Sequence, residues 1–356
     1  MRRYTILLLT SFMLILSLAA GMTIPVGADK NNRSVPLKEL TAYTTLPPEH
    51  VALLSEAYEH EHHVRVNFVP LSRTELLQQL RDDAVSDPTV VTTSDLVLAD
   101  SNVLERAAEL NLLKLYVSET NDAVKSVFKD EDGAWTGVWY DPVVFCINRD
   151  YLRTIADIPD TWTALADYRN VRIGITDFLA ADAGANLMCQ MIGQFGDSAA
   201  YDILDRLHPK VVQYAKYLSN PVRQAGMGEV DISVAVESET LRYMQNGYPL
   251  RIIYPADGTA FMLTGVAISS VDDGRLGAAA EFSDWLLSDE AQLVLQKNDF
   301  YFVPTNPQTL AYKKFAGKNL RLFDVKRSFS EQQCYQFLDH WVKQIRLKAP
   351  DEMGVR

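Results

Sequence analysis

Short apolar segments alternate with longer amphipathic segments along most of this chain, and this alternation constrains the fold more than any other feature. Leu40–Tyr43, Val64–Val69 and Asp95–Leu98 are predicted to be strands, and each is followed by a segment with helical periodicity. Strands that alternate with helices favour a mostly parallel sheet flanked by helices. The same alternation begins again after residue 138, so we expect an α/β protein with two lobes.

Two long extended segments, near Val138 and Leu263, are the expected connections between these lobes. The chain would cross to the second lobe through one segment and return through the other, so both would act as hinge strands. Lobe one is predicted to contain 38–139 and 266–356, including the C-terminal helices, and lobe two 140–265. A chain of 356 residues is long enough for two domains.

The first thirty residues indicate the compartment in which the chain works. Arg2 and Arg3 give a positive start, Ile6–Ala20 is an almost uninterrupted apolar run, and Val26–Ala28 ends in small residues. This is the layout of a secretory signal peptide, predicted here over residues 1–28, and it places the chain in the periplasm or outside the cell. An uncleaved anchor is the alternative, although a membrane span needs about 20 apolar residues. No cysteine follows the run, so we expect no lipoprotein.

Net charge and cysteine content limit the partners and the covalent framework. The formal net charge of −12 argues against nucleic acid and anionic lipid, because both require a positive protein surface. Cys146, Cys189 and Cys334 are too few for a disulfide framework. One bridge is possible, and buried free thiols are the favoured interpretation.

Four predicted strand ends are followed by polar residues that can begin a helix. In open α/β sheets, ligands lie beyond the carboxyl ends of the strands, where helix N-termini offer N–H groups and a positive dipole to an anion. Each of these segments taken alone could be an ordinary helix cap. Together they favour a shared anion site. The four segments are Tyr43–Pro47, Leu98–Asn102, Asp182–Asn186 and Ser219–Val222.

A wider set of segments carries a resemblance to a known family. The segments are Tyr43–Glu49, Phe128–Gly137, Ile147–Leu152, Ile158–Trp162, Tyr254–Thr259 and Ser288–Gln292, spread over Leu40–Pro304. Their order and spacing resemble those of type II periplasmic solute-binding proteins of ABC transporters, in particular the ferric-iron, hexose-phosphate, phosphonate and phosphoglycerate binders. The resemblance implies two lobes that close on a solute and a membrane transporter as the partner.

The resemblance also restricts the ligand. Iron binders of this family carry two adjacent tyrosines soon after a Gly-Glu segment, whereas here Gly228–Val236 leads to Glu237 and Ser238. Ferric ion is therefore disfavoured, and ferric binding without the tyrosine pair stays open as an alternative. A buried Glu237 could bind sugar hydroxyls or an amine, since a buried charge needs partners. The alternative is an exposed surface glutamate.

We expect a small anionic solute, phosphorylated or carboxylated, to be surrounded by residues from these segments. They are Thr44, Thr45, Asp100, Tyr140, Asp182, Gly184, Asn186, Ser219, Asn220, Glu237, Asp257 and Thr259. Hydroxyl groups and the backbone of Gly184 would bind the oxyanion. Asp182 and Asp257 would cap helices or bind hydroxyls, because a carboxylate repels a phosphate. Trp139 and Tyr140 could form a wall of the cleft or pack in the core.

No metal or cofactor is predicted. The His-rich run Glu59–His63 falls at the expected end of a helix, where histidines interact favourably with the dipole. Metal ligands also need neighbours that orient them, and nothing in the sequence suggests such neighbours.

An enzyme is not predicted either, because the chain has no Gly-x-Ser-x-Gly elbow, Walker loop, Cys-x-x-Cys pair or His-Glu-x-x-His helix. Hydrolysis is the weaker hypothesis. The expected protein is a monomer that presents its solute to the permease of an ABC importer. The alternative is a sensor that signals to a membrane histidine kinase, because lobe closure serves both roles.

Overall fold

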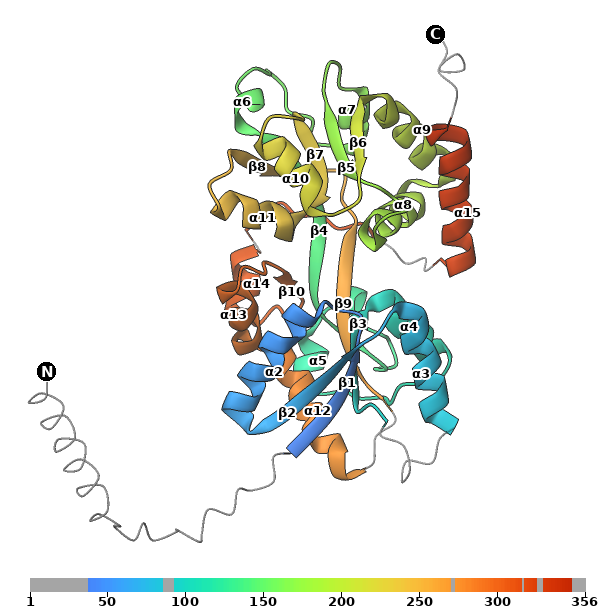
Figure 1. The fold of residues 1–356 in the computed structure, drawn as a ribbon, viewed down its shortest axis with the longest axis vertical. Coiled ribbons are helices and arrows are strands. Elements are labelled where there is room, and N and C mark those ends of the chain that lie inside the picture. The colour runs from blue at the N-terminus through green and yellow to red at the C-terminus, as the bar shows by residue number, and fades with distance from the viewer. Residues whose placement is uncertain (1–37, 86–92, 270–272, 316, 325–328, 348–356) are drawn as a thin grey trace, which may run out of the picture. The chain divides into compact units, whose positions relative to one another are not determined.

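The computed structural model describes residues 38–85, 93–269, 273–315, 317–324 and 329–347. All of them belong to one compact unit that begins at Lys38 (Figure 1). The predicted signal peptide, residues 1–28, lies outside the described residues. Within these ranges no helix combines the length and the apolar character that a membrane crossing requires.

Strands and helices alternate through most of this unit, as the sequence predicts. Their bounds in chain order are β1 (Lys38–Thr44), α2 (Pro48–His62), β2 (Val64–Pro70), α3 (Arg73–Val85), β3 (Leu96–Asp100), α4 (Ser101–Glu109), α5 (Glu119–Ala123), η1 (Ser126–Phe128), β4 (Thr136–Asn148), α6 (Arg149–Leu152), α7 (Trp162–Asp167), β5 (Ile173–Thr176), α8 (Asp182–Phe195), α9 (Asp197–Leu207), η2 (His208–Lys210), β6 (Val211–Ala215), α10 (Ser219–Gly226), β7 (Ile232–Val236), α11 (Glu237–Gln245), β8 (Leu250–Ile253), β9 (Phe261–Ile268), α12 (Asp273–Leu286), α13 (Asp289–Lys297), β10 (Val303–Pro304), α14 (Leu310–Phe315), α15 (Glu331–Trp341) and the π-helical turn η3 (Val342–Arg346).

The strands follow one pairing order, β2-β1-β3-β9-β4-β7-β5-β6, with β10 and β8 both pairing to β4. The first sheet contains the parallel strands β2, β1 and β3, followed by β9 and the start of β4 in antiparallel pairing. The second sheet contains the parallel strands β6, β5 and β7, followed by the end of β4 and by β8. Each sheet is therefore parallel except where it meets the connecting strands.

Strand β4 connects the two sheets. Its thirteen residues are all buried, and residues 136–142 pair with β9 whereas residues 143–147 pair with β7. Strand β9 returns the chain to the first sheet, and its neighbour Ala260 accepts a hydrogen bond from the Val143 amide at 2.8 Å. The two extended segments that the sequence suggested as connections are thus adjacent strands (Figure 1).

Side chains of the second sheet alternate between two cores, as expected for buried strands. Phe145 and Ile147 of β4 join the cluster formed with α7, α8 and α9, whereas Cys146 between them faces α10 and α11. In β7, Val234 joins the first of these clusters and Ala235 joins the second. Helices therefore cover both faces of the second sheet.

The end of the chain does not stay with the first sheet, although 266–356 were expected there. Phe323, Trp341 and Ile345 are buried in the core of the second sheet, and α15 packs against α8. Leu322 forms a parallel bridge with Thr259 near the connecting strands. The chain thus crosses between the cores a third time, because the apolar side chains of α15 are buried on the second lobe.

Gly265 in β9 lies where helix α4 and strand β4 approach most closely. A Cβ atom at this position would lie 2.8 Å from Leu104 Cδ1, 3.0 Å from the Thr136 carbonyl oxygen and 3.1 Å from Trp135 Cε3. Two of these neighbours belong to the buried core, and the third is backbone, so none can move freely.

We expect Gly265→Ala to lower the free energy of unfolding by about 2 kcal/mol, because overpacking a core typically costs 1–3 kcal/mol. Gly277→Ala is the matched control, since Gly277 is an exposed position of α12 with no atom within 4 Å of an added Cβ. That control should gain up to about 1 kcal/mol from helix propensity. Urea unfolding of both variants measures the difference. Equal stabilities would show that β9 has room for a side chain.

Candidate functional site

Arg73 brings together predicted contact residues from opposite sheets. Its guanidinium lies 2.8 Å from Asp100 Oδ1, at the end of β3, and 3.3 Å from Asp182 Oδ2, at the start of α8. The Thr45 hydroxyl donates to Asp100 Oδ2 at 3.0 Å. The ion pair between Arg73 and Asp182 links α3, a helix of the first sheet, with α8, a helix of the second sheet. Asp100 and Asp182 therefore flank one cation, and Thr45 binds Asp100.

The sheet topology explains why these residues meet. Strands β1 and β3 are adjacent and parallel, so Thr45 and Asp100 follow carboxyl ends at one edge of the first sheet. Strands β5 and β6 are likewise adjacent and parallel, so α8 and α10 begin at one edge of the second sheet. Ser219 and Asn220 form the start of α10 and are half-buried.

Arg73 was not predicted, although the sequence contains a signal for it. An arginine in the first turn of a helix faces the positive end of the dipole, which is unfavourable unless carboxylates lie close by. Arg73 is the first residue of α3, and it has two such carboxylates. These carboxylates come from distant parts of the chain, so their meeting could not be inferred from local pattern.

Gly184 and Asn186 position the start of α8. A Cβ at Gly184 would lie 2.7 Å from the Asp177 carbonyl oxygen, so only glycine allows this approach of helix and loop. The Asn186 amide donates to the Phe261 carbonyl oxygen at 2.8 Å, and the Gln190 amide donates to the same oxygen at 2.6 Å. These contacts hold α8 against β9 and so place Asp182.

Three further predicted residues have partners inside the protein. The Thr44 hydroxyl donates to the Leu98 carbonyl oxygen at 2.7 Å, and the Thr259 hydroxyl donates to the Val143 carbonyl oxygen at 2.6 Å. Asp257 accepts from the Trp162 amide at 3.1 Å, at the start of α7. Burial raises the pKa of Asp257, and the hydrogen bond from Trp162 partly offsets this increase. These side chains hold loops and strands in place.

Glu237 lies in a buried polar cluster, so the alternative of an exposed surface glutamate is wrong. Its Oε1 accepts a hydrogen bond from Lys318 Nζ at 2.8 Å and another from the Tyr254 hydroxyl. Burial and the charge of Glu237 raise the pKa of Tyr254. Burial also raises the pKa of Tyr140, and Tyr312 and Glu237 add to this effect. The amine that Glu237 binds here is thus a lysine of the chain itself.

Asp141 lies beside Glu237, at the point where β4 passes between the sheets. Its Oδ1 accepts from the Ser238 amide at 3.0 Å, and Oδ2 accepts from the Ser238 hydroxyl. Burial raises the pKa of Asp141 from 3.8 to about 7, the Ser238 hydrogen bonds act in the opposite direction, and Glu237 and Glu239 add to the increase. The carboxyl groups of Asp141 and Glu237 therefore both lie at the N-terminal turn of α11, where the positive end of the helix dipole favours negative charge.

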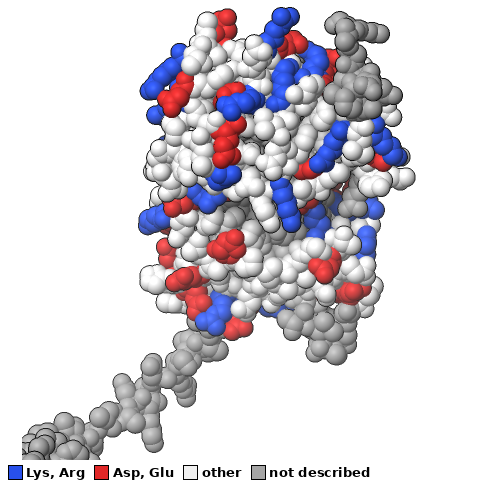
Figure 2. Space-filling model, turned by 45° about the horizontal axis from the view of Figure 1, so that its top comes forward, with Lys and Arg blue, Asp and Glu red and all other residues white. Residues whose placement is uncertain are grey.

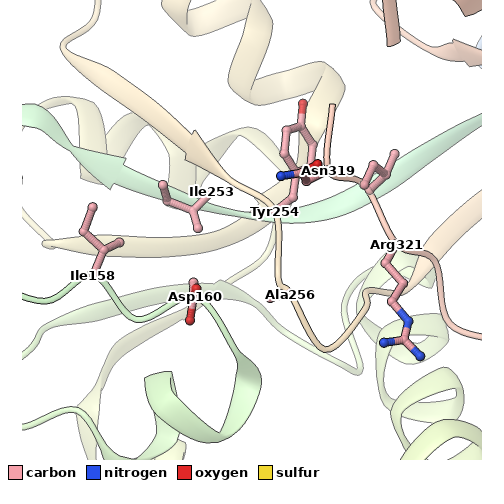
Figure 3. Close-up of a pocket in the computed structure, with 8 residues that line it drawn as sticks. Ile158, Asp160, Ile253, Tyr254, Ala256, Asn319 and Arg321 are labelled. Atoms are coloured by element: carbon pink, nitrogen blue, oxygen red, sulfur yellow. The ribbon is translucent and has the colours of Figure 1, made fainter. Parts of the chain in front are cut away.

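Two cavities adjoin the segment of residues 318–324. One of about 600 Å³ lies between Asp160 and Ile253 on one side and Tyr254 and Arg321 on the other (Figure 3). The other, of about 430 Å³, is lined by aromatic and cationic side chains that include Tyr140 and Lys318. Of the predicted contact residues, Tyr140 lines the second cavity and none lines the first.

Trp139 and Tyr140, the two aromatic residues expected to form a wall of the cleft or to pack in the core, lie in different surroundings. Tyr140 stacks on Phe128 with ring centroids 5.0 Å apart and faces the second cavity. Trp139 stacks on Phe302 at 5.7 Å and is buried in the core of the first sheet. The alternation of side chains along β4 separates these two neighbours, so Trp139 has the packing role.

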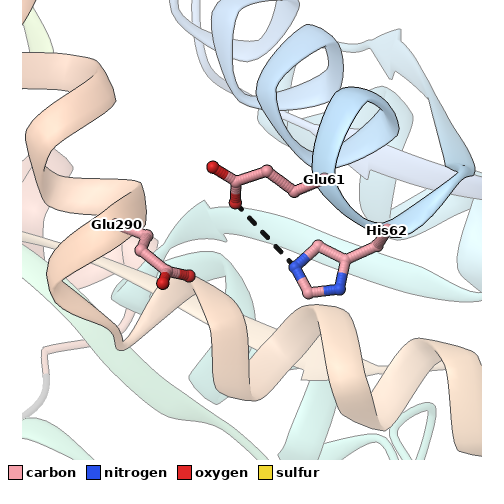
Figure 4. A group of neighbouring side chains, drawn as sticks. All are labelled: Glu61, His62 and Glu290. Carbon is pink, nitrogen blue, oxygen red and sulfur yellow. Dashed lines mark ion pairs between the residues drawn. The ribbon is translucent and has the colours of Figure 1, made fainter.

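A small group of metal-ligating residues lies away from these cavities. The group consists of Glu61, His62 and Glu290 (Figure 4). Each offers one ligand atom, and these three atoms lie within 4.8 Å of one another. Helix α2 ends at His62, as predicted for the His-rich run, and Glu290 comes from α13. All three side chains are exposed, whereas metal ligands are normally oriented by neighbouring groups. We therefore assign no metal to this group.

Lys and Arg side chains are interspersed with Asp and Glu side chains on the face shown in Figure 2. The net charge of −12 therefore does not make this face uniformly acidic. An anionic ligand that approaches it does not meet a continuous negative surface.

Comparison with known proteins relates the chain to binding proteins. Residues 92–322 match a family model described as bacterial extracellular solute-binding protein. An uncharacterized protein of Haemophilus influenzae is 29% identical over 259 residues, which are 68% of this chain and 73% of that protein.

Solved structures show the same fold. The periplasmic binding protein AfuA from Actinobacillus pleuropneumoniae, with fructose-6-phosphate bound, has a TM-score of 0.66 at 22% identity, covering 87% of this chain and 99% of AfuA. The ferric binding protein from Campylobacter jejuni has a TM-score of 0.65 at 20% identity, covering 89% and 100%. At these identities the likeness establishes the two-lobe α/β fold, which confirms the predicted fold class and resemblance.

Asp141 generates a prediction for the pH dependence of stability. Its pKa of about 7 in the folded protein exceeds the ordinary value of 3.8, so between these values the folded state holds a proton that the unfolded state releases. The free energy of unfolding should therefore fall, as the pH rises through this range, by at most about 1.4 kcal/mol per pH unit from this group. The fall ends above the folded pKa.

Asp141→Asn should remove this contribution. We expect the free energy of unfolding of Asp141→Asn, minus that of the unmodified protein, to increase from pH 5 to pH 7. Urea unfolding at pH 5, 6 and 7 measures this difference. Asp150→Asn is the control, because Asp150 is exposed and pairs only with Arg153 in the described part of the chain. A difference between Asp141→Asn and the unmodified protein that stays constant across these pH values would contradict the raised pKa.

Proposed function

Because this chain belongs to the bacterial extracellular solute-binding protein family, we propose that it captures a small anionic organic solute between its two lobes. Proteins of this family deliver solutes to ABC permeases and act outside the cytoplasm, and they are binding proteins rather than enzymes. The proposed solute is phosphorylated or carboxylated, and the proposed receiver is the permease of an ABC importer. Residues 1–28 are proposed to be a signal peptide removed on export.

The ion pair between Arg73 and Asp182 supports this proposal most directly. The Asp182 side chain is 66% exposed and that of Arg73 is 31% exposed. Ion pairs this accessible contribute only about 0–1 kcal/mol to stability. A phosphate or carboxylate of a solute can therefore replace Asp182 as a partner of Arg73 at little cost. Asp100 holds Nε and Nη2 of Arg73 at 3.3 and 2.8 Å, so the solute would take over the single contact that Asp182 makes at 3.3 Å.

The surroundings of Arg73 suggest what else the solute carries. Helix α8 has no side-chain cap at Ala181, so the amides of Asp182 and Ala183 are offered to an oxyanion. The Gly184 amide, which was expected to bind the oxyanion, donates to the Ala181 carbonyl oxygen at 3.0 Å instead. Ser219 and Asn220 would donate from the edge of the second sheet, whereas the Thr45 hydroxyl donates to Asp100 and holds that carboxylate in place. Once displaced, Asp182 would accept hydrogen bonds from hydroxyl groups. A sugar phosphate or a phosphorylated hydroxy acid fits this arrangement better than inorganic phosphate does.

Lobe closure would transmit binding to the transporter. We propose that lobe one contains 38–139 and the end of the return strand from residue 266, with α12, α13 and β10, and that lobe two contains 140–265 with α15. The lobes are joined through β4, β9 and residues 318–324. A solute held by Arg73 on one lobe and by α8 on the other would favour the closed arrangement through its contacts with both. The permease would then recognise that arrangement.

Thermal unfolding in the presence of candidate solutes tests the ligand class. A ligand at 100 times its Kd stabilises the native state by about 2.7 kcal/mol, which should raise Tm by about 4 °C in a protein of this size. We expect such a shift with a sugar phosphate or a phosphoglycerate and none with the uncharged sugar or with glycerol. A shift with ferric citrate alone would overturn the proposal in favour of iron binding.

Replacement of Arg73 tests the site. Arg73→Met should weaken binding of the stabilising solute by about 10- to 100-fold, because a hydrogen bond to a charged group contributes about 1.5–3 kcal/mol. Arg153→Met is the matched control, since Arg153 is exposed and pairs with Asp150 in the described structure, away from this contact. Isothermal titration calorimetry gives both affinities. Unchanged affinity in Arg73→Met would place the solute elsewhere, for example beside Tyr140.

A further inference from the structure

Two of the three cysteines lie against each other although they are far apart in the sequence. Cys189 is a buried residue of α8, and Cys334 is a half-buried residue of α15. Helices α8 and α15 pack against each other, and in the structure both cysteines are free thiols. The Cys334 thiol is a hydrogen-bond partner of the Cys189 thiol, and this contact together with burial raises the pKa of Cys189. Contact between two thiols on separate helices is the starting geometry for a disulfide.

Helix α15 is held so that Cys334 faces α8. Cys334, Phe337 and Trp341 follow the spacing of one helical face. Trp341 is fully buried, with its ring 4.8 Å from that of Phe178. The Phe337 carbonyl oxygen accepts a hydrogen bond from the Tyr201 hydroxyl at 3.3 Å. The face that carries Cys334 is therefore packed on the core of the second lobe.

Both ends of this helical segment are also anchored. Ser330 and Gln333 form a capping box at the start of α15, so the turn that contains Cys334 is ordered by its own hydrogen bonds. After the helix, Arg346 pairs with Asp177 at 2.7 Å, in the loop that leads to α8. The position of Cys334 thus follows from contacts on either side of it.

We propose that Cys189 and Cys334 form a disulfide after export, which staples the C-terminal helix to α8. The oxidant is a disulfide-bonded thiol oxidase of the periplasm. One cysteine thiolate attacks a sulfur of the oxidase disulfide, which forms a mixed disulfide and releases one oxidase thiolate. The second thiolate then attacks the cysteine sulfur of that mixed disulfide and releases the other. The chain loses two protons and two electrons, and the oxidase becomes a dithiol.

This inference does not depend on the proposed solute. It depends on the extracytoplasmic compartment, because disulfides persist in oxidising environments and are rare in the cytosol. Both helices belong to one core, so the staple stabilises the second lobe without joining the two lobes. Binding at Arg73 should therefore be the same in the oxidised and reduced forms, which separates this test from that of the solute site.

Cys146 provides an internal standard. It is buried in β4 with the hydroxyls of Ser233 and Thr240 as neighbours, and burial raises its pKa to about 12. Its hydrogen-bond neighbours are hydroxyls, whereas Cys189 has a second thiol beside it, so Cys146 should remain reduced. The mature protein is thus expected to contain one free thiol and one disulfide.

Thiol counting tests the pairing. Protein exported to a periplasm is unfolded without reductant, alkylated with iodoacetamide and weighed by mass spectrometry. We expect one adduct for the unmodified protein, two for Cys334→Ser and none for Cys146→Ser, with the tryptic peptides of Cys189 and Cys334 found linked. Three adducts on the unmodified protein would overturn the proposal. This count is made on the unmodified chain, so it remains decisive even where a variant folds poorly.

Stability measures the consequence. A disulfide that closes a long loop constrains the unfolded chain, so reduction should lower Tm of the unmodified protein by about 5–10 °C. The same reductant should leave the Tm of Cys334→Ser unchanged. It should lower the Tm of Cys146→Ser by as much as it lowers the Tm of the unmodified protein. An unchanged Tm on reduction of the linked protein would refute the stapling role.

Discussion

The backbone pairing of β4 is the constraint on which the rest of the structure depends. This strand is buried along its whole length, so each of its peptide groups must find a partner within the protein. Strands β9 and β10 supply partners to its first half, and β7 and β8 supply them to its second half. Both cores are therefore assembled on one strand. Strand β4 therefore also sets the relative positions of the two sheet edges at which the helices of the candidate site begin.

A buried polar cluster lies where the chain passes between the cores. Asp141, Glu237 and Lys318 come from β4, α11 and the third crossing, and they meet with Tyr254 and Ser238. Buried charges are costly unless they are paired, so these segments must keep their relative positions. The third crossing is thus part of the structure between the lobes and not a loose return of the chain. Any hinge motion must preserve these contacts or exchange them for others.

Local pattern predicted the elements better than the site. The predicted strand Val64–Val69 is β2, Val64–Pro70, because apolar and polar residues alternate along it. Strand β6 was not predicted, since Val212 and Gln213 are exposed at the sheet edge and weaken its apolar signal. In the candidate site, Asp100 and Asp182 were predicted and both contact Arg73, and the predicted Thr45 binds Asp100. Thr44 and Thr259 follow the same sequence pattern, yet their hydroxyls bind carbonyl oxygens inside the protein.

The sequence by itself determined the α/β alternation and the two extended connections, because both follow from composition and periodicity over neighbouring residues. Only the tertiary structure decided that Arg73 joins Asp100 to Asp182, that Lys318 neutralises Glu237 and that Cys334 lies against Cys189. These pairs are formed by residues from different helices, strands and loops. Their contacts depend on how the strands order themselves around β4, and no short-range pattern encodes that order.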